Sequence, residues 1–326
     1  MSLELVLWIV FHVVVAGMLA VDLGVFQRDP HKLSMREAVA WSIVWIAAAL
    51  LFNAGIWLLE GPQRGMEWLT AYLVEKALSV DNLFVFLVIF TYFGVPGHLQ
   101  PKVLLWGVLG AVVMRATLIA VGVTLVHLFH WILYVFGVLL VYTGWKLFRH
   151  AEEEPVDPSQ NRILHLVRRY FPVTEDYGRG RFFERRDGRL WATPLFLVVT
   201  VVESTDLMFA IDSIPAVLAI TRDLFTAYTS NIFAILGLRA LFFTLAGIMD
   251  MFRYLKYGLS VILMFIGVKM LIADLYKIPI GVSLGVVAAI LAVSVLASVL
   301  IPPPVPETAD APSSDPAVLE EGRPGG

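Results

Sequence analysis

About nine long hydrophobic stretches dominate this chain, and they decide what it can fold into. A helix needs about 20 apolar residues to cross the hydrocarbon core of a bilayer. Hydrophobic residues make up 59% of the 326 residues and charged residues only 16%. The sequence therefore predicts an all-α, polytopic membrane protein. The predicted helices lie near residues 3–25, 37–59, 66–93, 101–126, 130–149, 193–220, 226–249, 253–274 and 277–301.

Basic residues predict which loops face the cytoplasm. Arg28 and Lys32 follow the first predicted helix, and the segment 150–192 after the fifth carries many arginines. The loops on the opposite side carry few basic residues, among them Arg64 and Arg222. Because cytoplasmic loops are enriched in Lys and Arg, we expect the N-terminus outside and the C-terminus inside.

The chain outside the predicted helices leaves no room for a separate soluble domain. In the cytosolic loop 150–192 we expect a short helix near 159–171 and otherwise irregular chain. The tail 302–326 is rich in Pro, Ala, Asp and Glu, so we expect disorder there and a transmembrane domain over 1–301. The arginines of the loop favour contact with anionic lipid over nucleic acid, and protein partners could dock on it.

Two acid-bearing segments interrupt the predicted helices at membrane depth. One runs from Glu75 to Phe84 and the other from Glu203 to Pro215. A charged side chain at the bilayer centre costs roughly 2.5–3.5 kcal/mol on insertion scales, so such residues are rare and mark ion or substrate pathways. The sequence therefore predicts a cation pathway through the bundle.

The two acid-bearing segments also belong to a weak internal repeat. Three pairs match at an offset of about 124 residues: Asp81 with Asp206, Arg115 with Arg239, and Lys146 with Lys269. Each copy, 66–149 and 193–274, holds three predicted helices, so the second copy crosses the membrane in the opposite direction. Such inverted 3+3 repeats are typical of secondary transporters, whose sites lie near the midplane where the repeats meet.

Helical spacing groups the polar residues into faces. Glu75, Ser79 and Asn82 share one face, and Glu203, Asp206 and Ser213 share another, because residues four and seven apart nearly superpose. Asp81 and Asp212 lie about 120° away from those faces. We expect Pro215 to kink its helix and free the carbonyl of Ile211 as a further ligand.

The acid-bearing segments resemble a known family. Glu-Lys-x-Leu-Ser-x-Asp-Asn at 75–82 and Glu-x-x-Asp-x-x-Phe-Ala-x-Asp-Ser-Ile-Pro-Ala at 203–216 are similar to the two signature segments of the TerC family, membrane proteins named for tellurium resistance. The resemblance covers roughly residues 5–300. It implies a bacterial inner-membrane protein of the LysE-like transporter group, in which several members are associated with manganese or calcium export. The residues that match the family's acidic pattern are Glu75, Asp81, Asn82, Glu203, Asp206, Asp212 and Ser213.

We therefore expect a secondary exporter of a divalent cation and not an enzyme. Carboxylate, amide and hydroxyl oxygens suit Mg²⁺, Ca²⁺ or Mn²⁺ rather than Zn²⁺ or Cu⁺, and only the resemblance favours Mn²⁺ over Ca²⁺. The chain has no cysteine, which excludes thiolate catalysis. It also has no Gly-rich nucleotide loop, which argues against an ATP-driven pump. Carboxylates that exchange metal for protons are compatible with proton antiport, and we expect no bound cofactor.

Other readings stay open. The acids and the buried bases could form salt bridges that only hold the bundle together, with Arg115 and Arg239 balancing charge. Asp22 and Ser79 are further candidates for the path, although interfacial capping suits Asp22 better. A membrane scaffold or metal-donating partner, and an intramembrane hydrolase with paired acids, are the alternative functions.

Overall fold

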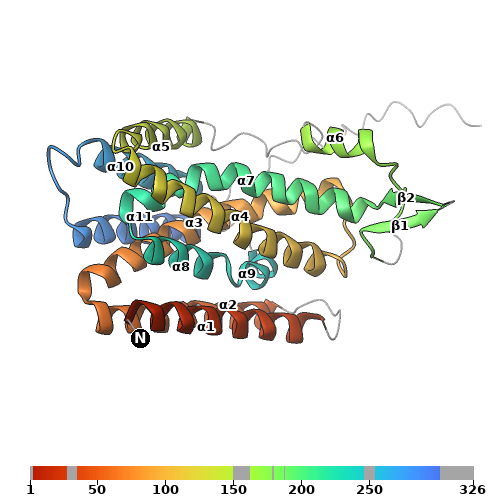
Figure 1. Ribbon diagram of the computed structural model, residues 1–326, viewed down its shortest axis with the longest axis horizontal. Coiled ribbons are helices and arrows are strands. Elements are labelled where there is room, and N and C mark those ends of the chain that lie inside the picture. The colour runs from red at the N-terminus through yellow and green to blue at the C-terminus, as the bar shows by residue number, and fades with distance from the viewer. Residues whose placement is uncertain are drawn as a thin grey trace, which may run out of the picture.

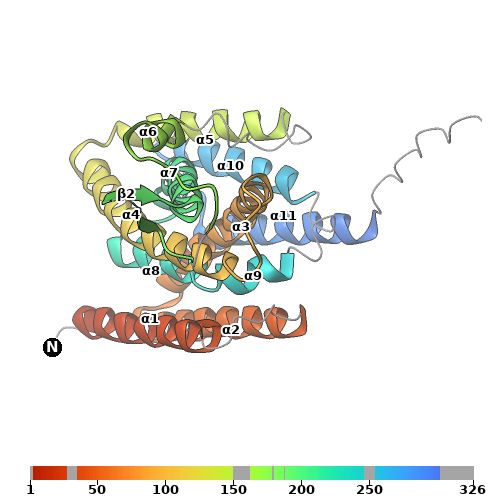
Figure 2. The same ribbon diagram turned by 90° about the vertical axis from the view of Figure 1, so that its right-hand side faces the viewer.

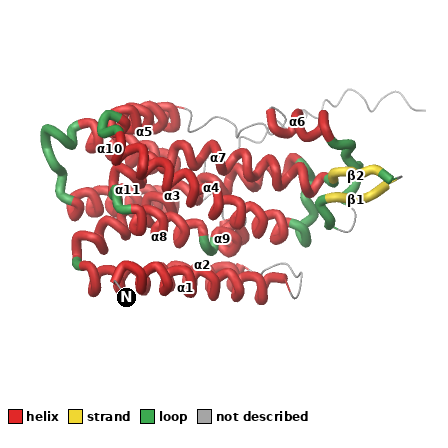
Figure 3. The backbone as a smooth tube through the Cα atoms, in the orientation of Figure 1, coloured by secondary structure: helices red, strands yellow, loops and turns green. Residues whose placement is uncertain are grey.

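The computed structural model describes residues 3–27, 35–149, 162–177, 180–186, 188–245 and 254–301. Helices form nearly all of these residues (Figure 3). The helices before the cytosolic loop are α1 (Leu3–Gln27), α2 (Met35–Glu60), α3 (Pro62–Tyr92), α4 (Gln100–Leu128) and α5 (Ile132–Arg149). The loop holds α6 (Arg162–Tyr170), β1 (Phe183–Arg186) and β2 (Arg189–Ala192). The helices after it are α7 (Pro194–Ile220), α8 (Leu224–Ile235), α9 (Leu238–Leu245), α10 (Leu255–Leu271) and α11 (Ile280–Leu300).

Seven candidate spans in the described chain are long and apolar enough to cross a membrane. One of them, Leu224–Thr244, combines α8 with most of α9. The other two predicted spans correspond to α3, which carries several charged residues, and to α10, which has 17 residues. The prediction of a polytopic all-α membrane protein is confirmed, whereas the count of nine spans stays a prediction.

The predicted helix 226–249 differs from the structure, because it is broken. α8 ends at Ile235, Leu236 is extended with φ −63° and ψ 137°, and α9 begins at Leu238. Gly237 between them has a φ of 80°, a left-handed conformation that glycine adopts without steric cost. Residues 246–249 of the predicted helix lie outside the described chain.

The helices surround a central pair, α3 and α7 (Figures 1 and 2). α1 and α2 form a layer of their own on one side, where α2 packs on α3 and α9 and α1 touches α8. α5 lies on the opposite side and packs along α10. Apolar side chains on the outer helices are exposed, for example Leu58 (84%) and Val113 (68%), as expected of surfaces that face lipid.

A small ordered cap, which consists of the described residues between 162 and 192 and includes α6, β1 and β2, covers one end of the bundle (Figure 1). α6 confirms the predicted short helix, but the expectation of otherwise irregular chain is wrong, because β1 and β2 pair as an antiparallel hairpin. Hydrogen bonds tie the cap to the bundle: for example, the Tyr177 hydroxyl donates to the Phe93 carbonyl at 2.7 Å, and Lys102 donates to the Gly180 carbonyl at 2.8 Å. Burial raises the pKa of Tyr177 to about 12, so its hydroxyl remains a donor at neutral pH.

Candidate cation site

The two acid-bearing segments meet because α3 and α7 run antiparallel through the centre of the bundle. Near one end, the Thr221 hydroxyl after α7 donates to Glu67 Oε2 at 3.1 Å. Glu75 lies about 12 Å further along α3, and Ser213 lies the same distance back along α7, at a rise of 1.5 Å per residue. Both segments therefore reach the same depth in the bundle interior.

A fully buried arginine joins the two segments. Arg115 of α4 is 0% exposed, and its guanidinium forms an ion pair with Glu75 Oε1. It also contacts both carboxylate oxygens of Asp206, with Nη2 to Oδ1 at 3.1 Å and Nε to Oδ2 at 3.4 Å. Asn231 Oδ1 of α8 accepts from Arg115 Nη1 at 3.4 Å. Four helices thus converge on one planar cation, which suits a guanidinium that binds carboxylates through several N–H groups.

Several buried polar atoms of α3, α7 and α8 lack a hydrogen-bond partner among the described residues. They are Glu75 Oε2, Ser79 Oγ, Ser213 Oγ and Asn231 Nδ2, all of them buried. Such groups are rare in proteins, and each costs about 1–3 kcal/mol when it stays unsatisfied. Three of the four are oxygens of α3 and α7, so the site offers unused ligands of the type that hard cations prefer.

Glu203 lies at the edge of this site. It is one helical turn before Asp206 on α7, is half-buried, and places its carboxylate against Gly110 of α4. A β-carbon at Gly110 would occupy the space of that carboxylate. Glycine at this position therefore makes room for the Glu203 side chain between the two helices.

The structure does not bring all predicted ligands together. Asp212 faces α5, where the Thr143 hydroxyl donates to its Oδ1 at 3.4 Å and Lys146 supplies a positive charge. Asp81 lies within the electrostatic influence of Lys256 on α10. Within the described chain, no three His, Asp or Glu side chains gather closely enough to hold a metal ion. This separation agrees with the 120° offset of these two acids from the main faces.

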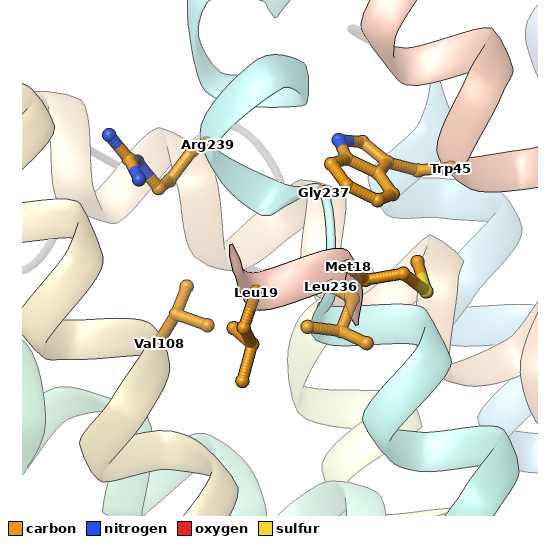
Figure 4. Close-up of a pocket in the computed structure, with 7 residues that line it drawn as sticks. All are labelled: Met18, Leu19, Trp45, Val108, Leu236, Gly237 and Arg239. Atoms are coloured by element: carbon orange, nitrogen blue, oxygen red, sulfur yellow. The ribbon is translucent and has the colours of Figure 1, made fainter. Parts of the chain in front are cut away.

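The remaining predicted residues lie as follows. Ser79, Asn82 and Ser213 are buried in α3 and α7. Asp22 belongs to α1, but its side chain lies outside the described part of the chain. Arg239 is 2% exposed and lines a small cavity with Trp45 and Gly237 at the break between α8 and α9 (Figure 4). Pro215 lies inside α7, which continues as a helix to Ile220.

At the centre of the bundle, sequence reasoning missed Asn231 and the contact that Lys76 makes. The sequence could have indicated Asn231, because it follows Thr229 and Ser230 to form a polar triplet in an otherwise apolar stretch. Lys76 lies next to Glu75, yet it points to another neighbour: its Nζ donates to backbone carbonyls of the broken helix, Ala234 at 3.0 Å and Leu236 at 3.5 Å. No periodicity of the sequence indicates that contact, because it depends on the break.

Comparison with known proteins places the chain in a family. The description "Integral membrane protein TerC family" matches residues 60–303, which include the central pair and both acid-bearing segments. The chain belongs to the TerC family. Its TerC region contains every helix from α3 to α11 and the cap between α5 and α7. A multi-pass integral membrane protein is therefore established.

Relatives of this TerC protein share most of their length with it. An "Uncharacterized membrane protein STKORF319" of Myxococcus xanthus is 47% identical over 309 residues, which cover 95% of each chain. A "Putative membrane-bound redox modulator Alx" of Escherichia coli K12 is 49% identical over 296 residues, covering 87% of this chain and 91% of the relative. A membrane protein of Rickettsia felis is 41% identical over 293 residues. No solved structure matches the chain.

Proposed function

We propose that this protein is a secondary exporter of a divalent cation, Mn²⁺ or alternatively Ca²⁺, which binds between α3 and α7. One observation carries the proposal: Glu75 and Asp206 share a single buried guanidinium, while α3 and α7 also carry buried oxygens without a hydrogen-bond partner. Oxygen donors without cysteine or histidine favour Mg²⁺, Ca²⁺ or Mn²⁺. The preference for Mn²⁺ rests on the resemblance of the acid-bearing segments to TerC proteins.

In this proposal Arg115 acts as an internal cation. With both carboxyls ionised, two acids and one guanidinium leave one net negative charge among buried side chains. An arriving divalent cation replaces the guanidinium between the carboxylates and takes up Ser79 and Ser213 as further oxygen ligands. Arg115 then keeps only its contact with Asn231 or moves toward water. Its return releases the metal, so the arginine limits how tightly the cation binds.

We also propose that the two copies of the repeat form an inverted pair that gives access to alternate sides. Contacts of α5 with α10 support the repeat: Gly137 abuts the Gly267 carbonyl and Gly144 abuts the Ser260 carbonyl. At an offset of 123 residues, Gly137 corresponds to Ser260 and Gly144 corresponds to Gly267, so each of these two contacts is the repeat counterpart of the other. The arrangement of the other helices supports it too, because α4 packs on α7 as α8 packs on α3. Broken helices such as α8–α9 are common at transporter sites.

The proposed orientation places the N-terminus outside and the cap in the cytoplasm of a bacterial inner membrane. Support comes from the basic loops and from the position of the cap, because α1 begins at the end of the bundle opposite the hairpin (Figure 1). Proton antiport is the proposed energy source, since carboxylates that bind a metal also bind protons.

Metal flux tests this function directly. Purified protein in inverted vesicles should take up Mn²⁺ when a pH gradient is imposed. Asp206→Asn should abolish uptake, because it removes one of two carboxylate ligands. Val113→Ala, on the lipid-facing side of α4, should transport normally and serves as the control. Uptake that equals that of empty vesicles, with correctly folded protein, would overturn the proposal.

The alternative is a membrane scaffold or metal-donating partner that docks other proteins on the cap. The exposed arginines of the hairpin, Arg185, Arg186 and Arg189, favour an acidic partner surface. The name of the Escherichia coli relative suggests a redox role, but this chain has no cysteine for thiol–disulfide exchange. A scaffold should bind its partner equally well with Asp206→Asn, whereas an exporter loses its activity.

A further inference from the structure

The break between α8 and α9 exposes backbone carbonyls inside the bundle. Leu236 N–H still donates to the Ile232 carbonyl, but the chain leaves the helix at Leu236. The carbonyls of residues 233–236 therefore lose the helical donors four residues ahead of them, whereas the Gly237 carbonyl accepts from Leu241 N–H at 3.0 Å in α9. They also lie at the negative end of the α8 dipole, which attracts positive charge. A helix end of this kind needs a donor or a cation.

Lys76 supplies that positive charge from the neighbouring helix. Its Nζ lies 3.0 Å from the Ala234 carbonyl oxygen and 3.5 Å from the Leu236 carbonyl oxygen, one on each side of Ile235. On the far side of the break, Gly237 fits against the ring of Trp45, and both line the small cavity of Figure 4 together with Arg239. The ammonium thus lies against the exposed end of α8.

We propose that the carbonyls at this break form a binding site for a monovalent cation, which the chain itself fills with the ammonium of Lys76. In broken transmembrane helices of transporters, unwound carbonyls and half-helix C-termini coordinate coupling cations. Here a tethered lysine occupies the equivalent position, so wild-type protein needs no dissolved ion at this point. Removing the lysine opens the site to Na⁺, Li⁺ or methylammonium. This inference concerns binding, and it does not depend on metal export.

The matched control is Lys102, a second lysine whose ammonium donates to a backbone carbonyl. Its Nζ lies 2.8 Å from the Gly180 carbonyl, in the cap rather than at a broken helix. Because that carbonyl lies in a loop, it lacks the aligned dipole of α8. Losing Lys102 should therefore create no cation site.

The test measures thermal unfolding of the purified full-length protein in detergent, titrated with NaCl, LiCl or methylammonium chloride against N-methylglucamine chloride at equal ionic strength. Lys76→Ala should show a saturable rise in melting temperature of at least about 2 °C with one of the small cations. Wild type and Lys102→Ala should not distinguish the salts. Lys76→Ala that is equally indifferent to all four salts would overturn the proposal.

A second variant keeps the test decisive where Lys76→Ala does not fold. Lys76→Arg retains a tethered cation, so it should fold and should not respond to the choice of salt. If Lys76→Ala fails to fold while Lys76→Arg folds, the result would support the need for a positively charged donor at the break. If neither Lys76→Ala nor Lys76→Arg folds while Lys102→Ala does, the proposal would be contradicted, because the site would then require the packing of lysine itself rather than a cation. Mn²⁺ uptake by the wild-type protein is measured separately. A failure of the exporter hypothesis would appear there and not in the salt titration.

Discussion

α4 and the α8–α9 pair occupy matching positions in the proposed repeat, yet they treat charge differently. α4 is one continuous helix of 29 residues, and its buried Arg115 binds acids from α3 and α7. α8 and α9 have 12 and 8 residues, and the break between them accepts Lys76 at its carbonyls. In one half of the bundle the guanidinium of Arg115 lies among carboxylates, and in the other half the ammonium of Lys76 lies among backbone carbonyl oxygens.

This difference teaches how a membrane bundle stabilises buried charge without water. A continuous helix satisfies its own backbone, so any charge on it needs side-chain partners. A broken helix leaves carbonyls unsatisfied, so a charge from elsewhere becomes favourable there. Side-chain carboxylates stabilise Arg115, and backbone carbonyls stabilise Lys76, so substitutions in the two regions should have different effects.

Arg115→Met should have the largest effect on stability. It leaves Glu75 and Asp206 buried without a counter-ion, a change that costs roughly 3–5 kcal/mol of unfolding free energy. Asp206→Asn should cost much less, because Arg115 keeps its ion pair with Glu75. Unfolding in detergent at neutral pH measures both, with Val113→Ala as the control. Equal loss from both acid and arginine variants would show that the ion pairs act only as structural links.

Gly237→Ala tests the broken half. The substitution forces an alanine into a φ of 80°, and its β-carbon would lie 2.5–2.8 Å from atoms of Trp45. We expect a loss of about 2–5 kcal/mol from strain and overpacking. Gly61→Ala is the matched control: its φ is 96°, but nothing lies within 4 Å of the new β-carbon, so about 1–2 kcal/mol should be lost. Similar losses at both positions would mean that Trp45 does not fix the break.

Gly110→Ala tests the continuous half at the edge of the cation site. The new β-carbon would displace the Glu203 carboxylate, which is the far end of a flexible side chain, so stability should change little. If Glu203 guides the cation, Mn²⁺ uptake should fall about tenfold, because small displacements at a site have large effects on rate. Gly55→Ala, with no atom within 4 Å of its β-carbon, should leave uptake unchanged. Unchanged uptake in Gly110→Ala would remove Glu203 from the path.

The smallest predicted effect on stability concerns the N-terminal ends of α4 and α8. Leu99 provides no side-chain cap for α4, whereas Asp223 caps α8 by accepting from Thr226 N–H at 2.8 Å and pairs with Arg64 at 2.6 Å. Burial alone would raise the pKa of Asp223, but hydrogen bonds from Arg64 and Thr226 and the charge of Arg64 together hold its pKa below the usual value.

A lowered pKa in the folded state means that Asp223 stabilises the protein above its unfolded pKa of about 3.9, and that this stability is lost as pH falls. Asp223→Asn keeps a cap but loses the ion pair, which is partly exposed and worth at most about 1 kcal/mol. The difference in melting temperature between wild type and Asp223→Asn should shrink from pH 6 to pH 3. A difference that grows toward acid pH would contradict the assigned shift.

Hydropathy alone located the helices well but could not locate the break. The predicted span 193–220 agrees closely with α7, because a continuous apolar run sets both ends. Gly237 gave no warning, since glycine in an apolar helix more often permits close packing than a turn. The hairpin was predictable: Asp187-Gly188 between Arg186 and Arg189 is a strong two-residue turn signal, which the many arginines obscured.

The candidate site was predicted in part. Helical spacing put Asp81 and Asp212 on other faces than Glu75 and Asp206, and the structure gives these two acids other neighbours. Arg115 was considered only as a base that could balance charge, and its position at membrane depth, not spacing, suggested it. Spacing within one helix cannot say which helix lies opposite, so Asn231 and the contact of Lys76 with α8 were beyond it. These contacts arise from packing between helices, and only the three-dimensional fold contains that information.

The most direct test of the central claim is the effect of Mn²⁺ on the melting temperature of three proteins in detergent. If Arg115 is an internal cation that the metal replaces, Mn²⁺ should stabilise wild type, should stabilise Arg115→Met more strongly because the competitor is gone, and should not stabilise Asp206→Asn. N-methylglucamine chloride at equal ionic strength is the control. Indifference of both wild type and Arg115→Met to Mn²⁺, with Asp206→Asn as unstable as Arg115→Met, would contradict the account.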